Sequence, residues 1–184
     1  MARVQKYIRV GGWKRNPADP KGTKEGVPNF LRWMGWSLNP KWSPPEPTLK
    51  NIKVDLYLTG NIVPIKSVPR KHRKAYRDTL ARFALACHRA GYGPGGNKGK
   101  RHVNSTYRFN HEQVALFEKN MIAPGIPKPG HAFTAVPGKS PHEKGIGLDV
   151  PDVRDEDDLI RECRILDLWD DVPSEKWHLT NHAA

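Results

Sequence analysis

SPHEKGIGLDV, residues Ser140 to Val150, carries the most informative pattern in the chain. Its apolar residues Ile146, Leu148 and Val150 alternate with other residues. In a strand, this alternation would place all three side chains on one buried face. The stretch therefore predicts a strand with one buried face.

The opposite face of this strand carries residues that suit a binding site. Gly145, Gly147 and Asp149 would share it, and two glycines beside an aspartate leave open space above the backbone. His142 lies just before the strand and can swing over the same face. Imidazole and carboxylate groups are both good zinc donors, so this face is a candidate wall of a metal site.

A second cluster, Glu175-Lys176-Trp177-His178, lies near the end of the chain. Its spacing would put Glu175 and His178 on one side of a helical turn. Catalytic zinc usually has three protein ligands and one water, whose pKa falls towards ~7. His142, Asp149 and His178 would supply the ligands, and Glu175 would take the proton of the water. Taken singly, both spacings also occur by chance, and Glu-x-x-His is commonly a surface turn.

Together these residues resemble a known family. Ser140, His142, Gly145 and Asp149, followed by Glu175, Trp177 and His178, look like the motifs of zinc D-alanyl-D-alanine carboxypeptidases, vancomycin-resistance dipeptidases and phage L-alanyl-D-glutamate endolysins. The resemblance covers roughly residues 68–184. It implies a small α+β metallopeptidase that cuts peptidoglycan stem peptides, with the ligands and base named above. The segment between Asp149 and Glu175 is short for the family, so carboxypeptidase and endopeptidase activity both stay open.

An upstream segment extends the resemblance. Ser105-Thr106-Tyr107-Arg108 with Gln113 is similar to the family's Ser-Gly-Tyr-Arg…Gln segment, with Thr106 where glycine is usual. By resemblance, Arg108 binds the substrate and the developing oxyanion, a role that suits a fixed cation. The resemblance also implies that Ser140, Tyr107 and Gln113 contact the substrate.

The charge of the chain is unevenly distributed. The 184 residues carry a net charge of +12, but residues up to Arg101 hold 22 Lys and Arg against 5 acids, whereas later residues hold 9 against 14. A basic half predicts a polyanionic partner, which can be nucleic acid, anionic lipid or an anionic wall polymer. No recognised nucleic-acid motif accompanies the charge, so we expect a wall polymer or a docking partner instead.

Other features exclude whole classes of protein. No apolar run reaches the length of a membrane span, and no apolar segment near Met1 predicts a signal peptide. Cys87 and Cys163 are too few for a disulfide framework and fit the core faces of helices. We expect synthesis in a host cytoplasm and action at the cell wall through a virion or lysis system.

The chain is expected to have two parts. Residues 1–67 form a basic arm rich in Pro and Trp, with a short hairpin made by strands over 52–58 and 61–66. Residues 68–184 form the zinc peptidase domain. Periodicity predicts helices over 69–90, 111–120 and 155–169, and a strand over 102–108. The expected class is α+β, with a small antiparallel sheet and flanking helices around a zinc cleft.

The functional expectation is a zinc-dependent peptidase acting on peptidoglycan stem peptides, encoded by a phage. The alternative is a structural component of a phage tail or virion in which the peptidase-like domain is a passenger or a local wall-degrading module. Four tryptophans in the arm favour docking, either onto its own domain or onto phage tail or virion proteins: Trp13, Trp33, Trp36 and Trp42.

Overall fold

The computed structural model describes residues 7–9, 36–38, 46–172 and 175–184. The chain divides into two units, Met1–Glu46 and Pro47–Ala184. The expected boundary after residue 67 falls inside the second unit, because Tyr57 and Leu58 are buried in its core.

In the first unit, strand β1 (Tyr7–Arg9) pairs antiparallel with strand β2 (Trp36–Leu38). Residue Tyr7 lies opposite Leu38 in this pair. Most of the expected arm, including Trp13, Trp33 and Trp42, lies outside the described residues. The docking of the arm therefore stays a prediction.

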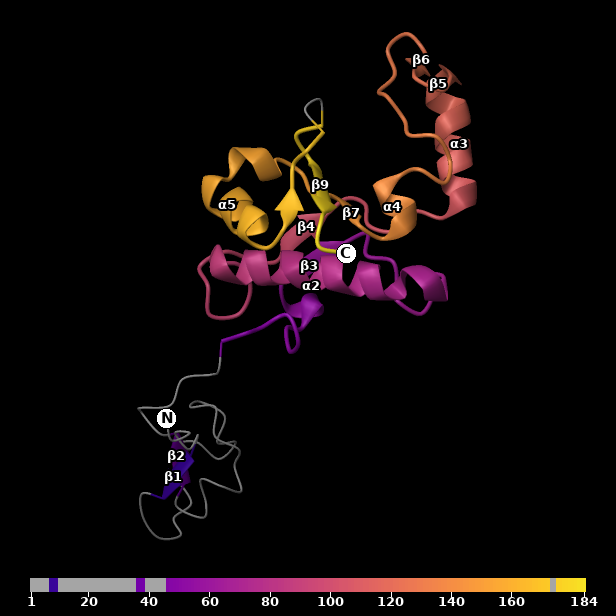
Figure 1. Cartoon of the computed structure of the whole chain (residues 1–184). Coiled ribbons are helices and arrows are strands. Elements are labelled where there is room, and N and C mark those ends of the chain that lie inside the picture. Colours follow the sequence, from indigo (N-terminus) through magenta and orange to yellow (C-terminus); the bar gives the residue numbers. More distant parts are fainter. Residues whose placement is uncertain (1–6, 10–35, 39–45, 173–174) are drawn as a thin grey trace. The chain divides into compact units, whose positions relative to one another are not determined.

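Helix α2 (Arg73–Arg89) runs across the second unit beneath the C-terminal helix and sheet in the view of Figure 1. The short 3₁₀ helix η2 (Arg70–His72) precedes it, so the helix expected over 69–90 is confirmed. Gly91, with φ of +83°, follows the helix, and glycine adopts this left-handed conformation without a steric cost. Tyr76, Leu80, Phe83, Ala84 and Cys87 are buried at the expected helical spacing. Thr79, Ala81, Leu85 and Ala86 are buried as well, so the second half of the helix is enclosed on most sides.

A three-stranded antiparallel sheet lies against α2, in the order β7–β9–β8. Its strands are β7 (Gly147–Asp149), β8 (Leu168–Trp169) and β9 (His178–Asn181), and every residue of β9 is buried. The register of β7 and β9 sets Asp149 opposite His178. The expected α+β class, with a small antiparallel sheet flanked by helices, is confirmed.

Helix α5 (Asp157–Ile165) packs against α2 and follows the 3₁₀ helix η3 (Val153–Asp155). Its acids Asp157 and Asp158 occupy the first turn, where the helix dipole favours negative charge. The helix ends at Ile165 and not at residue 169, because Leu168 and Trp169 pair in β8 with β9. Both cysteines, Cys87 and Cys163, are buried as expected.

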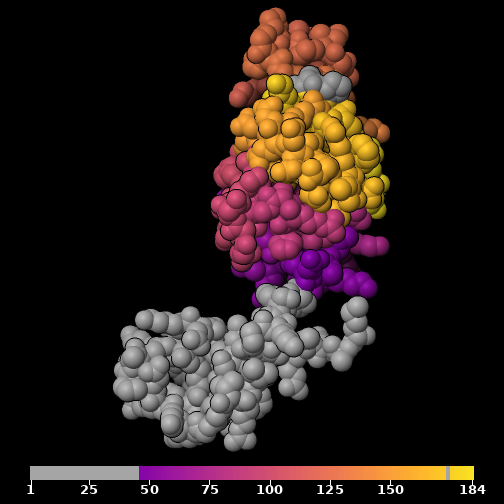
Figure 2. Space-filling view, turned by 90° about the vertical axis from the view of Figure 1, so that its left-hand side faces the viewer, coloured from indigo at the N-terminus to yellow at the C-terminus, as the bar shows by residue number. Residues whose placement is uncertain are grey.

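Helix α3 (Asn110–Asn120) and the strands β5 (Met121–Ala123) and β6 (Ile126–Pro127) project from the body beside helix α4 (Pro141–Lys144) (Figure 1). In the space-filling view, the C-terminal layer of α5 and the sheet lies between α2 and this projection (Figure 2). Among the described residues, no helix is both long and apolar enough to cross a membrane.

The expected hairpin over residues 52–66 is wrong. Residues Val54–Leu56 form the 3₁₀ helix η1, and strand β3 (Leu58–Gly60) pairs in parallel with strand β4 (Arg101–Val103). Of the alternating apolar side chains, Ile52 and Val54 pack partly buried against the core and Leu58 is buried in it, whereas Leu56 is exposed. Because about forty residues separate β3 from β4 in the sequence, no local pattern of residues predicts their pairing. The strand expected over 102–108 is correspondingly short.

The open space expected above Gly145 and Gly147 is filled. Gly145 lies outside the strand and ends α4 with φ of +77°, where a Cβ atom would approach Cβ of Tyr76 to 2.9 Å. A Cβ on Gly147 would lie 2.9 Å from the backbone nitrogen of His142. These glycines therefore allow α4 to pack closely on α2 and β7.

We predict that Gly145→Ala destabilises the fold more than Gly130→Ala does. Both residues have φ of +77°, but nothing lies within 4 Å of a Cβ on Gly130. The left-handed conformation should cost about 1–2 kcal/mol in either variant. The clash with Tyr76 should add about 1–3 kcal/mol in Gly145→Ala alone. Equal midpoints in urea unfolding would contradict the close packing of α4 on α2.

Candidate metal centre

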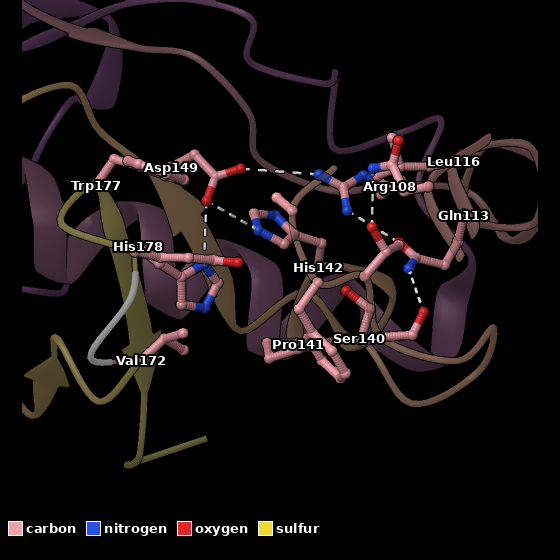
Figure 3. Close-up of a pocket in the computed structure, with 16 residues that line it drawn as sticks. Arg108, Gln113, Leu116, Ser140, Pro141, His142, Asp149, Val172, Trp177 and His178 are labelled. Carbon is pink, nitrogen blue, oxygen red and sulfur yellow. Dashed lines mark hydrogen bonds and ion pairs between the residues drawn. The ribbon is translucent and has the colours of Figure 1, made fainter. Parts of the chain in front are cut away.

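His142, Asp149 and His178 come together in the second unit, as the sequence predicted. One ligand atom from each residue lies within 4.8 Å of the others. The Oδ1 atom of Asp149 is 3.2 Å from Nε2 of His142 and 3.0 Å from Nδ1 of His178 (Figure 3). Both imidazoles are buried, with exposed fractions of 4% and 3%.

Local structure explains how His142 reaches this place. Ser140 and Glu143 form a capping box, and Pro141 occupies the first turn of α4, where its missing N–H is tolerated. The helix is only one turn long because Gly145 ends it. His142 therefore lies directly above Gly147 of β7, whose lack of a side chain makes room for the ring.

The orientation of His142 is set by a backbone carbonyl. Its Nδ1 atom lies 2.6 Å from the carbonyl oxygen of Thr106, so Nδ1 carries the proton and donates it there. The lone pair of Nε2 then faces Asp149. The Thr106 hydroxyl is itself held, because it accepts a hydrogen bond from the Tyr76 hydroxyl and donates one to the carbonyl of Asn61.

A longer relay orients His178. Its Nε2 atom lies 3.2 Å from Oγ1 of Thr180, and that hydroxyl donates to Oδ1 of Asp171 at 2.9 Å. Because the hydroxyl hydrogen is used on Asp171, the Thr180 oxygen accepts the N–H of His178. The Nδ1 lone pair is thereby left for the cluster. On its other side, Asp171 accepts a hydrogen bond from Nε2 of His182 at 2.7 Å.

Thr180 and Asp171 were missed at the level of sequence. For Thr180 a signal existed, because residues two apart in a strand share a face, and Thr180 follows His178 in β9. For Asp171 there was none. It reaches Thr180 from the loop after β8, and only the tertiary fold brings the two together.

The electrostatics keep Asp149 ionised. Burial raises the pKa of this carboxyl, but hydrogen bonds and positive charge from His142 and His178 in their protonated forms lower it more, so its pKa lies well below the usual range. A bound metal ion would take the place of the protons on the two ring nitrogens that face Asp149. An ionised carboxylate and two imidazole lone pairs are a donor set that suits a divalent transition metal. The buried group His142, Asp149 and His178 can therefore hold a metal ion.

The cluster opens into a cleft of about 300 Å³. One wall comes from the sheet and the loop before β9, with Glu175, Trp177 and Val172. The facing wall comes from α3 and the segment before α4, and it is largely apolar through Leu116, Ala132, Phe133 and Ala135. Helix α3 and residues 132–135 thus supply the wall that faces the sheet.

Arg108 and Gln113 form a connected pair on the cleft wall. Nη2 of Arg108 lies 3.7 Å from Oδ2 of Asp149, and Nη1 donates to Oε1 of Gln113 at 2.9 Å. The amide of Gln113 then donates to the carbonyl of Ala135 at 2.7 Å. Gln113 is fully buried, so its contacts make it a support for Arg108.

Glu175 lies beside the cluster on a backbone turn and not on a helical one. The N–H of His178 donates to the carbonyl of Glu175 at 3.1 Å, and Oε2 of Glu175 is 3.9 Å from Nδ1 of His178. Its side chain is 24% exposed and lines the cleft. A carboxylate here can exchange a proton with a group bound at the cluster.

The two other predicted substrate contacts lie in different places. Ser140 is buried and lines the cleft. Tyr107 is not among the residues that line this cleft, and its ring packs against Tyr76, Phe109 and His72 on the other side of α4. The contact predicted between Tyr107 and a substrate therefore has no support from this arrangement.

Comparisons of the chain with models of known protein families, with curated proteins and with solved structures find no match.

We predict that Thr180→Val and Asp171→Asn each weaken metal binding by about 10–100-fold, the usual effect of removing an outer partner of a metal ligand. Loss of the relay frees His178 to place its proton on Nδ1, the atom that faces Asp149. Competition with a chromophoric chelator measures the affinity. Thr134→Val is the matched control, since Thr134 is buried on the facing wall and bonds Asn120. An equal loss in the control would contradict the relay.

Proposed function

We propose that the protein is a zinc-dependent peptidase. One observation carries this proposal: the buried group His142, Asp149 and His178 opens into a cleft whose walls also carry Glu175 and Arg108. Two imidazoles and one carboxylate are a common ligand set of catalytic zinc, which keeps a further position open. Zinc bound by these three residues would polarise a carbonyl group and lower the pKa of a water molecule.

The chain's own residues would supply acid–base chemistry. Glu175 would accept the proton of the attacking water on its carboxylate and pass it to the amine that leaves. This requires mobility of the side chain, which its partial exposure allows. Arg108 would direct its guanidinium at the negative charge that develops on the carbonyl oxygen, and Gln113 holds Arg108 in place for this role.

The substrate class follows from the motif and the walls of the cleft. The residue pattern resembles peptidases of peptidoglycan stem peptides, and the cleft offers one guanidinium beside small apolar surfaces such as Ala132 and Ala135. Stem peptides carry carboxylates and alanine methyl groups, which fit these two kinds of surface. We therefore propose peptidoglycan stem peptides as substrates, with the cell wall as the place of action.

A second candidate is a phage tail or virion component that carries the peptidase domain as a local wall-degrading module. The division into two units favours it, because the first unit has its own strand pair and can serve a different partner. Phage origin and delivery by a virion or lysis system are part of this proposal. Co-purification of the chain with assembled particles would separate this candidate from a free lytic enzyme.

We predict that Glu175→Gln lowers the rate of stem-peptide hydrolysis by about 10²–10⁴-fold, because the amide cannot accept the proton. Metal content should stay unchanged, since Glu175 is not among the three proposed ligands. Mass spectrometry of digested peptidoglycan measures the products and identifies the bond that is cut. Glu118→Gln, on the exposed side of α3, is the control. Full activity of Glu175→Gln would reject the proposed base.

We predict that Arg108→Ala lowers kcat by about 10²–10³-fold, as removal of a group that stabilises an oxyanion does. Gln113→Ala should have a smaller effect of the same kind, because it only releases Arg108 from one partner. Steady-state kinetics on a soluble stem peptide measure both. A rise in KM with unchanged kcat would show that Arg108 binds the ground state alone.

A further inference from the structure

A row of cations lines a groove at the N-terminal end of α2, away from the residues of the metal centre. The groove has a volume of about 760 Å³. We call it the basic groove and define it by five residues of η2 and α2: Arg70, Lys71, Arg73, Lys74 and Arg77.

These cations have no acidic partner among the described residues. Arg73 donates to the backbone carbonyls of Lys66 and Val68 and to no carboxylate. The acidic side chain that lines the groove, Asp78, is already paired with Arg82 at 2.6 Å. The described residues that line the groove therefore carry a net positive charge.

The position on the helix strengthens this charge. The first turns of a helix present its positive dipole end, which disfavours cations. The first turn of α2 has no acid, although the first turn of α5 has two. The stability of the helix therefore does not explain why basic residues occur at this end of α2, whereas the binding of an anionic ligand would explain it.

Spacing indicates the form of the ligand. Lys74 and Arg77 are both exposed and lie three residues apart, and Arg70 lies four residues before Lys74. Along a helix axis these separations are about 4.5–6 Å. Evenly repeated cations match a chain with evenly repeated anions better than a single ion. Among the described residues that line the groove none is aromatic, so this lining lacks the stacking surface on which proteins hold nucleic-acid bases.

We propose that the basic groove binds an anionic polyol-phosphate polymer of the bacterial wall and so holds the protein on its insoluble substrate. The choice of a wall polymer rests on the proposed function. The first unit is not a suitable occupant, because residues 1–46 hold nine Lys and Arg against three acids and would be repelled.

The test measures binding of the full-length chain to purified wall sacculi by co-sedimentation across a range of salt concentrations. All proteins carry Glu175→Gln, so that no cleavage changes the sacculi. Lys74→Glu/Arg77→Glu is compared with Lys100→Glu/Lys119→Glu, which makes the same change in net charge at exposed residues elsewhere. Glutamine versions of the first pair, checked by circular dichroism, guard against misfolding. Sacculi stripped of phosphodiester polymers by hydrofluoric acid form the second arm.

We expect Lys74→Glu/Arg77→Glu to lower the affinity for native sacculi at least ~10-fold. The slope of log affinity against log salt concentration should fall in magnitude by about one unit for each lost contact. The control pair should lose less than ~3-fold, and stripped sacculi should bind the unaltered groove as weakly as native sacculi bind the variant. Equal losses in both pairs, or full binding to stripped sacculi, would overturn the proposal. Tighter binding to a DNA duplex than to the purified polymer would also overturn it.

This binding test is independent of catalysis. If hydrolysis of a soluble stem peptide is absent but the groove variant loses sacculus binding, the proposed function fails and the groove survives. If hydrolysis is present and binding is unaffected by the variant, the groove proposal fails alone.

Discussion

The register of β7 and β9 is the constraint on which the site depends, because it places Asp149 opposite His178. A shift by one residue would turn one of these side chains to the other face of the sheet. With the observed register, one carboxylate oxygen lies within hydrogen-bond distance of two imidazoles from different parts of the chain. The helix α4 needs only one turn to bring His142 to the same point.

The core holds this arrangement through polar contacts as well as apolar packing. Thr79 of α2 donates to the carbonyl of Gly145 at 3.0 Å and accepts a hydrogen bond from the Asn181 amide at 2.9 Å. One buried hydroxyl thus ties α2 to both the end of α4 and the end of β9. Buried polar groups of this kind are costly unless they are satisfied, so they specify one arrangement of the elements.

The sequence predicted the local features well. The grouping of His142, Asp149 and His178 is predicted because two short segments, each with a common spacing, together match the motifs of a known family, and α2 because its apolar residues recur at helical spacing. Features that depend on distant contacts were not predicted: the pairing of β3 with β4, the reach of Asp171 to Thr180, and the place of Tyr107 behind α4. The glycines were read as open space, whereas they allow close packing, because a sequence does not show what approaches a missing side chain.

The two parts of the chain with opposite charge have different proposed roles. The acidic C-terminal part holds the candidate metal centre, and the basic start of α2 offers a surface that attracts anions.

The proposed activity depends on metal binding, and zinc titration monitored by native mass spectrometry tests metal binding most directly. We expect one zinc ion per chain in the unaltered protein and none in Asp149→Ala at the same free zinc concentration. The control variant His131→Ala should also bind one zinc ion, because His131 is exposed and lies outside the cluster. A protein that takes up no zinc, or an Asp149→Ala variant that takes up as much as the unaltered chain, would contradict the account.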